Sequence, residues 1–223
     1  MPTRVDSSER PRRPGRPPKS QARDTRTLLV EAAQDLFARH GFAGTSVRAV
    51  ARAAGLSESA VYAHFASKQE LFAAILAPAG PGSVLSLLGA GDLDELDPPT
   101  FVRELAIRTI QVWDQPHARQ LTSILTRDGL LTEQASGASL KAGIAQVRRT
   151  LGARFAAWAS AGLLATQAPP EQLAWELFAP IGYVRLLYLH AAASAQERAA
   201  GRELARRHVD FFVDAVFTRH DQS

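Results

Sequence analysis

Apolar residues recur at spacings of three and four along most of the chain, which is the period of an α-helix. Leu29, Ala33 and Phe37 share one face of a helix expected over residues 24–39, and Gly41 follows where that helix would end. Convincing alternation with period two does not occur in the sequence. We therefore predict an all-α fold.

Three long helices are expected in the second half of the chain, over residues 134–161, 171–193 and 201–219. The last two have apolar residues on more than one face. An isolated monomer would expose part of that surface, so the pattern favours burial between two copies of the chain.

Proline and glycine divide the sequence. Five of the 13 prolines lie in the first 18 residues, and a second cluster occupies residues 78–82. Because proline lacks the backbone N–H that a helix interior needs, both clusters mark boundaries. We expect a disordered arm over 1–23, a three-helix domain over 24–77 and a larger helical bundle over 83–219.

Composition limits the class of protein. The chain has 223 residues, 46% of them hydrophobic and 22% charged, and its apolar runs are too short for a membrane span. It contains no cysteine, which excludes disulfides, thiolate metal sites and a cysteine nucleophile. We expect a soluble protein with no membrane partner and a cytoplasmic location.

Charge is concentrated at the N-terminus. Residues 1–23 hold seven arginine or lysine residues and two acidic ones, whereas the net charge of the whole chain is only +4. A basic tail on a nearly neutral body is typical of an arm that binds a polyanion. The run from Arg13 to Pro17 partly resembles an AT-hook, but Pro14 stands where that core has an arginine. The arm is therefore either a contact to the minor groove or phosphates, or a solubilising tail.

The segment from residue 44 to residue 65 predicts a helix-turn-helix. Thr45 is expected to cap a short helix with Val50 on its apolar side. Gly55 would end that helix in a tight turn with positive φ, and Ser57 would cap a second short helix. Two short helices joined in this way place the second helix in the DNA major groove.

Exposed positions of the second helix suit base edges. Glu58 can accept a hydrogen bond from a cytosine amine, and Ala60 can contact a thymine methyl group. Residues farther along, together with the start of the first helix, would contact phosphates. The candidate DNA-binding residues are Arg13, Arg16, Thr45, Arg48, Ser57, Glu58, Ser59, Ala60, Tyr62, His64 and Lys68.

Two of these candidates have ordinary alternatives. Tyr62 could pack its ring in the core, and Lys68 could belong to a solvated helix start in which Ser67 and Glu70 form a capping box.

The run from Thr45 to Leu71 resembles the DNA-binding domain of the TetR family of bacterial repressors. The helix-turn-helix is followed in order by Tyr-x-His-Phe and Ser-Lys-x-x-Leu, and the resemblance covers residues 24–72. It implies a homodimeric repressor that binds a palindromic operator and is released by a small molecule. Ala63 departs from the pattern, since some relatives carry a larger side chain there that packs on DNA.

The resemblance also implies an effector pocket in the second domain. Most of its aromatic and aliphatic residues fit an ordinary hydrophobic core, but the bundle could also enclose an apolar pocket with His117 or Arg185 as polar groups. The effector would be hydrophobic or aromatic. The candidate pocket residues are Phe101, Leu105, Trp113, His117, Leu121, Leu125, Phe155, Trp158 and Tyr183.

Pairing of the last two helices across a two-fold axis would set two recognition helices about 34–36 Å apart, one DNA turn. The candidate interface residues are Leu177, Ile181, Val184, Tyr188, Val209, Phe212, Val213 and Val216.

Evidence for catalysis is missing from the sequence. The histidines are scattered without metal-ligand spacing, and neither a P-loop nor a nucleophile elbow occurs. We therefore expect no enzymatic activity, no metal and no cofactor. The main interpretation is a DNA-binding transcriptional regulator, and the alternative is a helical ligand-binding protein that does not act on DNA.

Overall fold

The computed structural model of the protein describes residues 24–127 and 135–217, without the side chains of residues 135–139. Every regular element in these ranges is a helix, and the one β-bridge, between Leu164 and Phe217, is isolated. The all-α prediction is confirmed. The elements are α1 (Thr25–Gly44), α2 (Val47–Ala53), α3 (Glu58–Tyr62), α4 (Lys68–Leu76), α5 (Pro81–Gly89), α6 (Pro98–Trp113), α7 (Pro116–Arg127), α8 (Ala135–Ser160), α9 (Pro170–Tyr188) and α10 (Ala195–Val216).

Local signals account for most helix starts. Proline occupies the first position of α5, α6, α7 and α9, where its missing N–H costs no helical hydrogen bond. The last helix begins at Ala195, six residues before the predicted start, because Ser194 and Glu197 form a capping box there. Gly41, at φ 76°, interrupts α1 as the sequence indicated.

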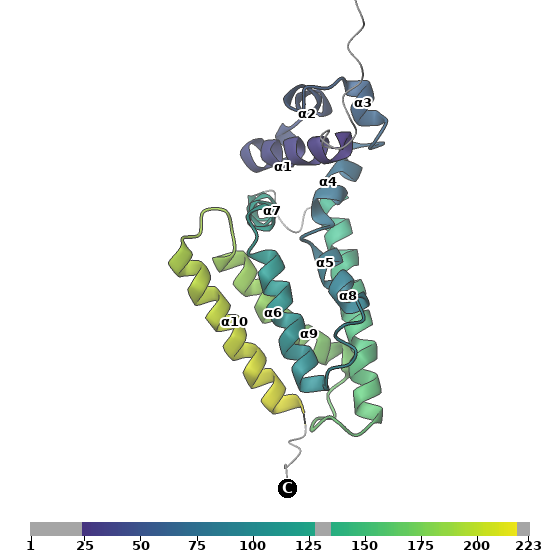
Figure 1. The fold of residues 1–223 in the computed structure, drawn as a ribbon, viewed down its shortest axis with the longest axis vertical. Helices are drawn as coiled ribbons and strands as arrows, with labels where there is room; N and C mark the ends of the chain where they lie inside the picture. The colour runs from purple at the N-terminus through teal and green to yellow at the C-terminus, as the bar shows by residue number, and fades with distance from the viewer. Residues whose placement is uncertain (1–23, 128–134, 218–223) are drawn as a thin grey trace, which may run out of the picture.

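The helices, arranged as in Figure 1, enclose two clusters of buried hydrophobic side chains. The first joins α1 to α4, and the second joins α5, α6, α8, α9 and α10. Helix α7 lies beneath α1, and its inner residues Ala118, Leu121 and Ile124 belong to the first cluster. The first cluster is therefore completed by a helix from the second half of the chain.

The acidic loop before α6 is held by two ion pairs. Asp92 pairs with Arg108 of α6, and Asp94 pairs with Arg154 of α8. The hydrogen bond from Arg108 lowers the pKa of Asp92. The loop is thus tied to two helices of the bundle.

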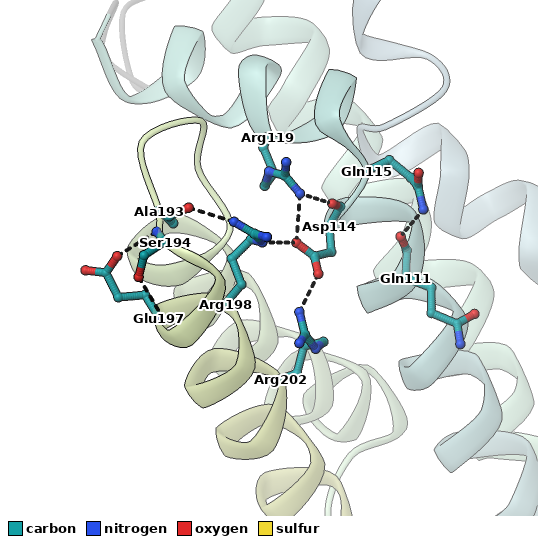
Figure 2. Close-up of polar contacts among 9 residues, drawn as sticks. All are labelled: Gln111, Asp114, Gln115, Arg119, Ala193, Ser194, Glu197, Arg198 and Arg202. Carbon is teal, nitrogen blue, oxygen red and sulfur yellow. Dashed lines mark hydrogen bonds and ion pairs between the residues drawn. The ribbon is translucent and has the colours of Figure 1, made fainter.

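Asp114, in the turn between α6 and α7, accepts contacts from three arginines (Figure 2). Its carboxylate lies 3.2 Å from Nη1 of Arg119 and 3.2 Å from Nε of Arg198, and Nη1 of Arg202 contacts its other oxygen. The side chain of Asp114 is only 18% exposed. Arg198 and Arg202 come from α10, so this cluster joins the start of α7 to α10.

Within the described residues, no individual helix combines the length and apolar character needed to cross a bilayer. Helices α4 and α5 meet at a bend of 50° and reach that threshold by length and composition only when taken together.

We expect Asp114→Asn to lower the free energy of unfolding by about 1–3 kcal/mol, because hydrogen bonds to charged groups are worth that much and three guanidinium groups would lose their anion. Each kcal/mol lowers the melting temperature by about 2–4 °C in a chain of this size. Asp35→Asn is the control, since Asp35 and Arg39 form an exposed pair at 3.9 Å and should change little. Equal melting temperatures for the two variants, measured by circular dichroism, would contradict a stabilising role for the cluster.

Candidate functional site

Helices α2 and α3 form the predicted helix-turn-helix. Gly55 adopts φ 69° in the turn, as the sequence predicted. Residues with a Cβ atom rarely adopt this backbone conformation. The N–H of Leu56 donates to the carbonyl of Ala51 at 2.9 Å, which closes the turn. Val61, at 1% exposed, anchors α3 in the first cluster.

Serine caps begin three successive helices. Oγ of Ser46, Ser57 and Ser67 accepts from the backbone N–H three residues later, at 3.1, 3.3 and 3.1 Å. The caps at Ser57 and Ser67 were predicted, whereas the prediction that Thr45 caps the first helix was wrong. Glu70 accepts from Ala66 N–H at 2.7 Å and not from Ser67 N–H, so the alternative of a capping box formed by Ser67 and Glu70 was wrong in its second half.

Thr45 is buried, at 3% exposed, and its hydroxyl donates to the carbonyl of Gly41 at 2.9 Å. Thr45 therefore stabilises the break at the end of α1, and the structure does not present its side chain at the surface with the other candidate DNA-binding residues.

The exposed side of α3 is polar. Ser57, Glu58 and Ser59 are exposed, and Ala60 is partly exposed. The Glu58 carboxylate lies 3.7 Å from Nε of Arg48, so these two candidates are adjacent across the turn. Beyond α3, Tyr62 is 54% exposed, which excludes a ring packed in the core. His64 is also exposed.

Lys68 connects the end of α1 to the start of α2. Its Nζ donates to the carbonyls of Phe42 at 2.8 Å and Thr45 at 3.0 Å, and it lies 4.4 Å from the centre of the Phe42 ring. An ammonium group has three protons, so one remains for a phosphate. Lys68 is therefore neither a fully solvated residue at the start of α4 nor a cation whose donors are all free for a phosphate.

A cavity of about 460 Å³ lies among α5 to α9. Of the candidate pocket residues, it is lined by Trp113, Leu125 and Tyr183, together with Arg185, which the sequence suggested as a polar group. The full lining is Pro81, Val84, Trp113, Thr122, Leu125, Leu140, Lys141, Ile144, Val147, Arg148, Ala174, Trp175, Phe178, Ala179, Gly182, Tyr183, Arg185 and Leu186.

Six candidate pocket residues lie elsewhere. Four of them belong to the second cluster, namely Phe101, Leu105, Phe155 and Trp158. The ring centres of Trp158 and Phe217 lie 5.7 Å apart there. Leu121 belongs to the first cluster. His117 is exposed at the start of α7, and its carbonyl accepts from Gln34. The pattern identified apolar residues correctly but did not show which of them contact one another and which border a space.

Arg185 is the most deeply buried cation of the cavity, at 8% exposed. Its Nε donates to Oγ1 of Thr122 at 3.0 Å, and its guanidinium carbon lies 4.7 Å from the centre of the Trp113 ring. Burial lowers the pKa of Arg185 to about 10. At neutral pH the guanidinium group remains protonated.

Most residues of the candidate dimer interface are buried inside the monomer. Seven of its eight residues are buried inside the monomer, and Tyr188 is half-buried. The seven are Leu177, Ile181, Val184, Val209, Phe212, Val213 and Val216. The large apolar side chains that α9 and α10 expose are Trp175, Tyr183, Leu187, Leu204 and Phe211.

Several residues of the cavity were not among the sequence candidates. Trp175 and Phe178 come from the surplus apolar faces of α9, which had been noted without a division between inner and outer sides. Lys141 and Arg148 stand seven residues apart on α8, a spacing that places two cations on one face. Arg13 and Arg16 lie outside the described residues. Among the residues that are described, no group of three His, Asp or Glu side chains could hold a metal ion.

Comparison with known proteins shows that the first part of the chain is similar to a known family. Residues 29–75 match the family model described as "Bacterial regulatory proteins, tetR family". The chain is 33% identical over 90 residues to the probable HTH-type transcriptional regulator ArpR of Pseudomonas putida. It is 31% identical over 100 residues to the HTH-type transcriptional regulator AcrR of Shigella flexneri. These matches cover 40% and 42% of this chain and 43% of each relative.

Solved structures show the same fold over most of the chain. SmeT, described as the repressor of the Stenotrophomonas maltophilia multidrug efflux pump SmeDEF, aligns with a TM-score of 0.69 at 24% identity and covers 89% of this chain and 92% of its own. NalD, described as the secondary repressor of the MexAB-OprM multidrug efflux pump in Pseudomonas aeruginosa, aligns with a TM-score of 0.69 at 23% identity, covering 88% and 98%. At this identity the likeness concerns the fold.

Proposed function

Because residues 29–75 place this chain in the TetR family of bacterial regulatory proteins, we propose that it is a transcriptional repressor that binds a palindromic operator as a homodimer and is released by a small molecule. The observation that carries the proposal is the exposed polar side of α3 on a helix whose other side is fixed in the core by Val61. In this proposal, residues 24–77 bind DNA, and residues 83–219 bind the effector and form the dimer.

Helix α3 would enter the major groove with Glu58, Ser59 and Ala60 at base edges. Glu58 pairs with Arg48 in the free protein, and exchanging this exposed contact for DNA would cost little. Tyr62, His64 and the remaining proton of Lys68 would contact phosphates, which fixes the position of α3 in the groove. The N-terminal arm, with Arg13 and Arg16, would add contacts to the minor groove or to phosphates.

The dimer would form through the apolar side chains that α9 and α10 leave exposed. Phe211 is 73% exposed and Tyr183 is 62% exposed, unusually high values for such large apolar residues. Tyr183 also lines the cavity, so a partner copy packed on α9 would lie beside the effector. Two copies related by a two-fold axis would present two α3 helices to successive turns of DNA.

Helix α7 would carry the signal between the cavity and the DNA-binding helices. Its Thr122 lines the cavity, while Gln34 of α1 donates to the carbonyl of His117 at 2.7 Å and to the side chain of Gln120 at 3.1 Å. At the other end of α7, Arg127 donates to the carbonyl of Arg39 at 2.6 Å. A shift of α7 on effector binding would therefore move α1 and with it the helix-turn-helix.

The effector would be a hydrophobic or aromatic small molecule. The cavity of about 460 Å³ lies in the usual range for such ligands, and its lining is mostly apolar. A related structure is described as a complex of SmeT with triclosan, an instance of this kind of ligand in a protein of the same fold.

Selection from a random duplex library at near-physiological salt tests DNA binding. We expect a palindrome with half-sites about one turn apart. Glu58→Gln should then alter the preferred base at one position of each half-site, at a cost of about 1–3 kcal/mol for the original sequence, because a carboxylate that accepts from cytosine would be lost.

Glu176→Gln is the matched control, because it makes the same charge change at an exposed position of α9. It should leave the selected sequence unchanged. Absence of any salt-dependent duplex binding would favour the alternative, a ligand-binding protein that does not act on DNA.

Phe211→Glu should convert the dimer to a folded monomer with weakened operator binding, as measured by analytical ultracentrifugation and circular dichroism. Ile107→Glu is the matched control, since Ile107 is also an exposed apolar residue, at 44%, but lies on α6. Phe212→Glu should instead unfold the protein, because Phe212 is only 5% exposed. A Phe211→Glu protein that sediments as a dimer would place the interface elsewhere.

Joint replacement of Gln34 and Arg127 by alanine should uncouple the two halves. In the natural protein, we expect addition of the selected operator to slow amide hydrogen exchange in α7 and α9 as well as in α3. In the double variant, the protection of α3 should persist while that of α9 is lost. Gln115→Ala removes an exposed contact to Gln111 within the same region and serves as the control. Unchanged protection of α9 in the double variant would exclude α7 as the connection.

A further inference from the structure

The charged residues that line the cavity are all cations. Lys141 and Arg148 come from α8 and Arg185 from α9, and neither aspartate nor glutamate is among the lining residues that the structure describes. A positively charged ligand would meet repulsion at this lining without any compensating carboxylate.

These cations differ in their surroundings. Arg148 is 45% exposed and pairs with Glu171 at 3.4 Å, so its charge is already compensated. Arg185 is 8% exposed, and no ion pair to an acidic side chain forms at Arg185 within the part of the chain that the structure describes. A guanidinium group removed from water without an anion is costly.

The side chain of Arg185 is held in place, with one end free. Nε donates to Thr122, whose hydroxyl donates in turn to the carbonyl of Ala118 at 3.1 Å, and the guanidinium plane lies against the ring of Trp113. Nη2 of Arg185 has no hydrogen-bond partner, and neither does Nε1 of Trp113. Two buried N–H donors at one cavity thus lack an acceptor.

The rest of the lining suits an apolar group. Leu125, Val147 and Phe178 lie around the cavity, along with further aliphatic and aromatic side chains. A ligand that satisfies the whole cavity therefore needs an apolar body and one acidic head.

We propose that the cavity binds a hydrophobic carboxylic acid, with its carboxylate on Arg185 and its apolar body among the aromatic and aliphatic side chains. A carboxylate matches the donors of a guanidinium group in geometry and charge. The inference rests on the proposed function in that it names the chemical class of the effector, but binding itself can be measured without DNA.

The first experiment compares three probes with one apolar body: 1-naphthaleneacetate, its primary amide and the corresponding 2-(1-naphthyl)ethylamine. Binding to the full chain is measured by isothermal titration calorimetry at pH 7.5. We expect the acid to bind at least tenfold more tightly than the amide, on the order of 1.4 kcal/mol. The carboxylate would compensate the buried charge of Arg185, whereas the neutral amide would only accept a hydrogen bond from it. The amine should bind more weakly than the amide. Equal affinity for acid and amide would overturn the proposal.

The second experiment uses Arg185→Met, which keeps the unbranched stem and removes the charge. We expect it to abolish the preference for the acid while leaving the affinity for the amide within about threefold. The melting temperature of the free variant should equal or exceed that of the natural protein, because an unpaired buried cation has been removed. A merely structural Arg185 would give a lower melting temperature and weaker binding of both probes.

Arg149→Met is the matched control, since Arg149 is an exposed cation on α8 that bonds to Gln146 and does not line the cavity. It should retain the acid preference. An acid preference that survives in Arg185→Met would assign the anion to another cation and overturn the proposal.

The two proposals fail in different ways. Selection of a palindromic operator together with equal binding of acid and amide would leave the repressor intact and remove the acid. Tight, Arg185-dependent acid binding without duplex binding would leave the ligand class intact and remove the DNA function.

Discussion

The packing of α7 against α1 is the contact on which the rest of the structure depends. Ala118, Leu121 and Ile124 are at most 1% exposed, and they complete a cluster whose other members come mainly from α1 to α4. The helices that present α3 therefore cannot be buried without a helix from the second half of the chain. This constraint joins the exposed side of α3 to the bundle through one shared core, in addition to the chain connection through α4.

The same helix carries the hydrogen bonds that hold Arg185. Thr122 follows Ala118 by one helical turn, so its hydroxyl can donate to the carbonyl of that residue and still accept from Nε of Arg185. A carboxylate bound to Arg185 would polarise this chain of hydrogen bonds and compensate the charge at its end. Pairing of the buried Arg185 would therefore release free energy at Thr122, on the same helix that packs on α1. The proposed release from DNA requires a coupling of this kind between the cavity and α1.

The helix-turn-helix was predictable because its signals are local. Gly55, Ser57 and Ser67 act within three residues of their own positions, and all three behave as expected. The division of apolar residues among core, cavity lining and surface was not predictable, because helical period identifies apolar faces without showing which one turns inward. Phe211 and Phe212 are neighbours of the same type, yet one is 73% exposed and the other 5%. The difference arises from the packing of α10 on α6 and α9, which spacing along one helix cannot reveal.

Polar residues near the candidate DNA surface show a related limit. Thr45 and Lys68 were predicted as DNA contacts from residue type and position, but the first is buried and the second donates to two backbone carbonyls. Backbone groups at the break between α1 and α2 lack helical partners, and these two side chains supply them. Tyr62 and His64, by contrast, remain exposed. The demand for backbone hydrogen bonds at helix ends therefore decides which polar side chains near α3 stay exposed, and it fixes the ammonium group of Lys68 at the break between α1 and α2.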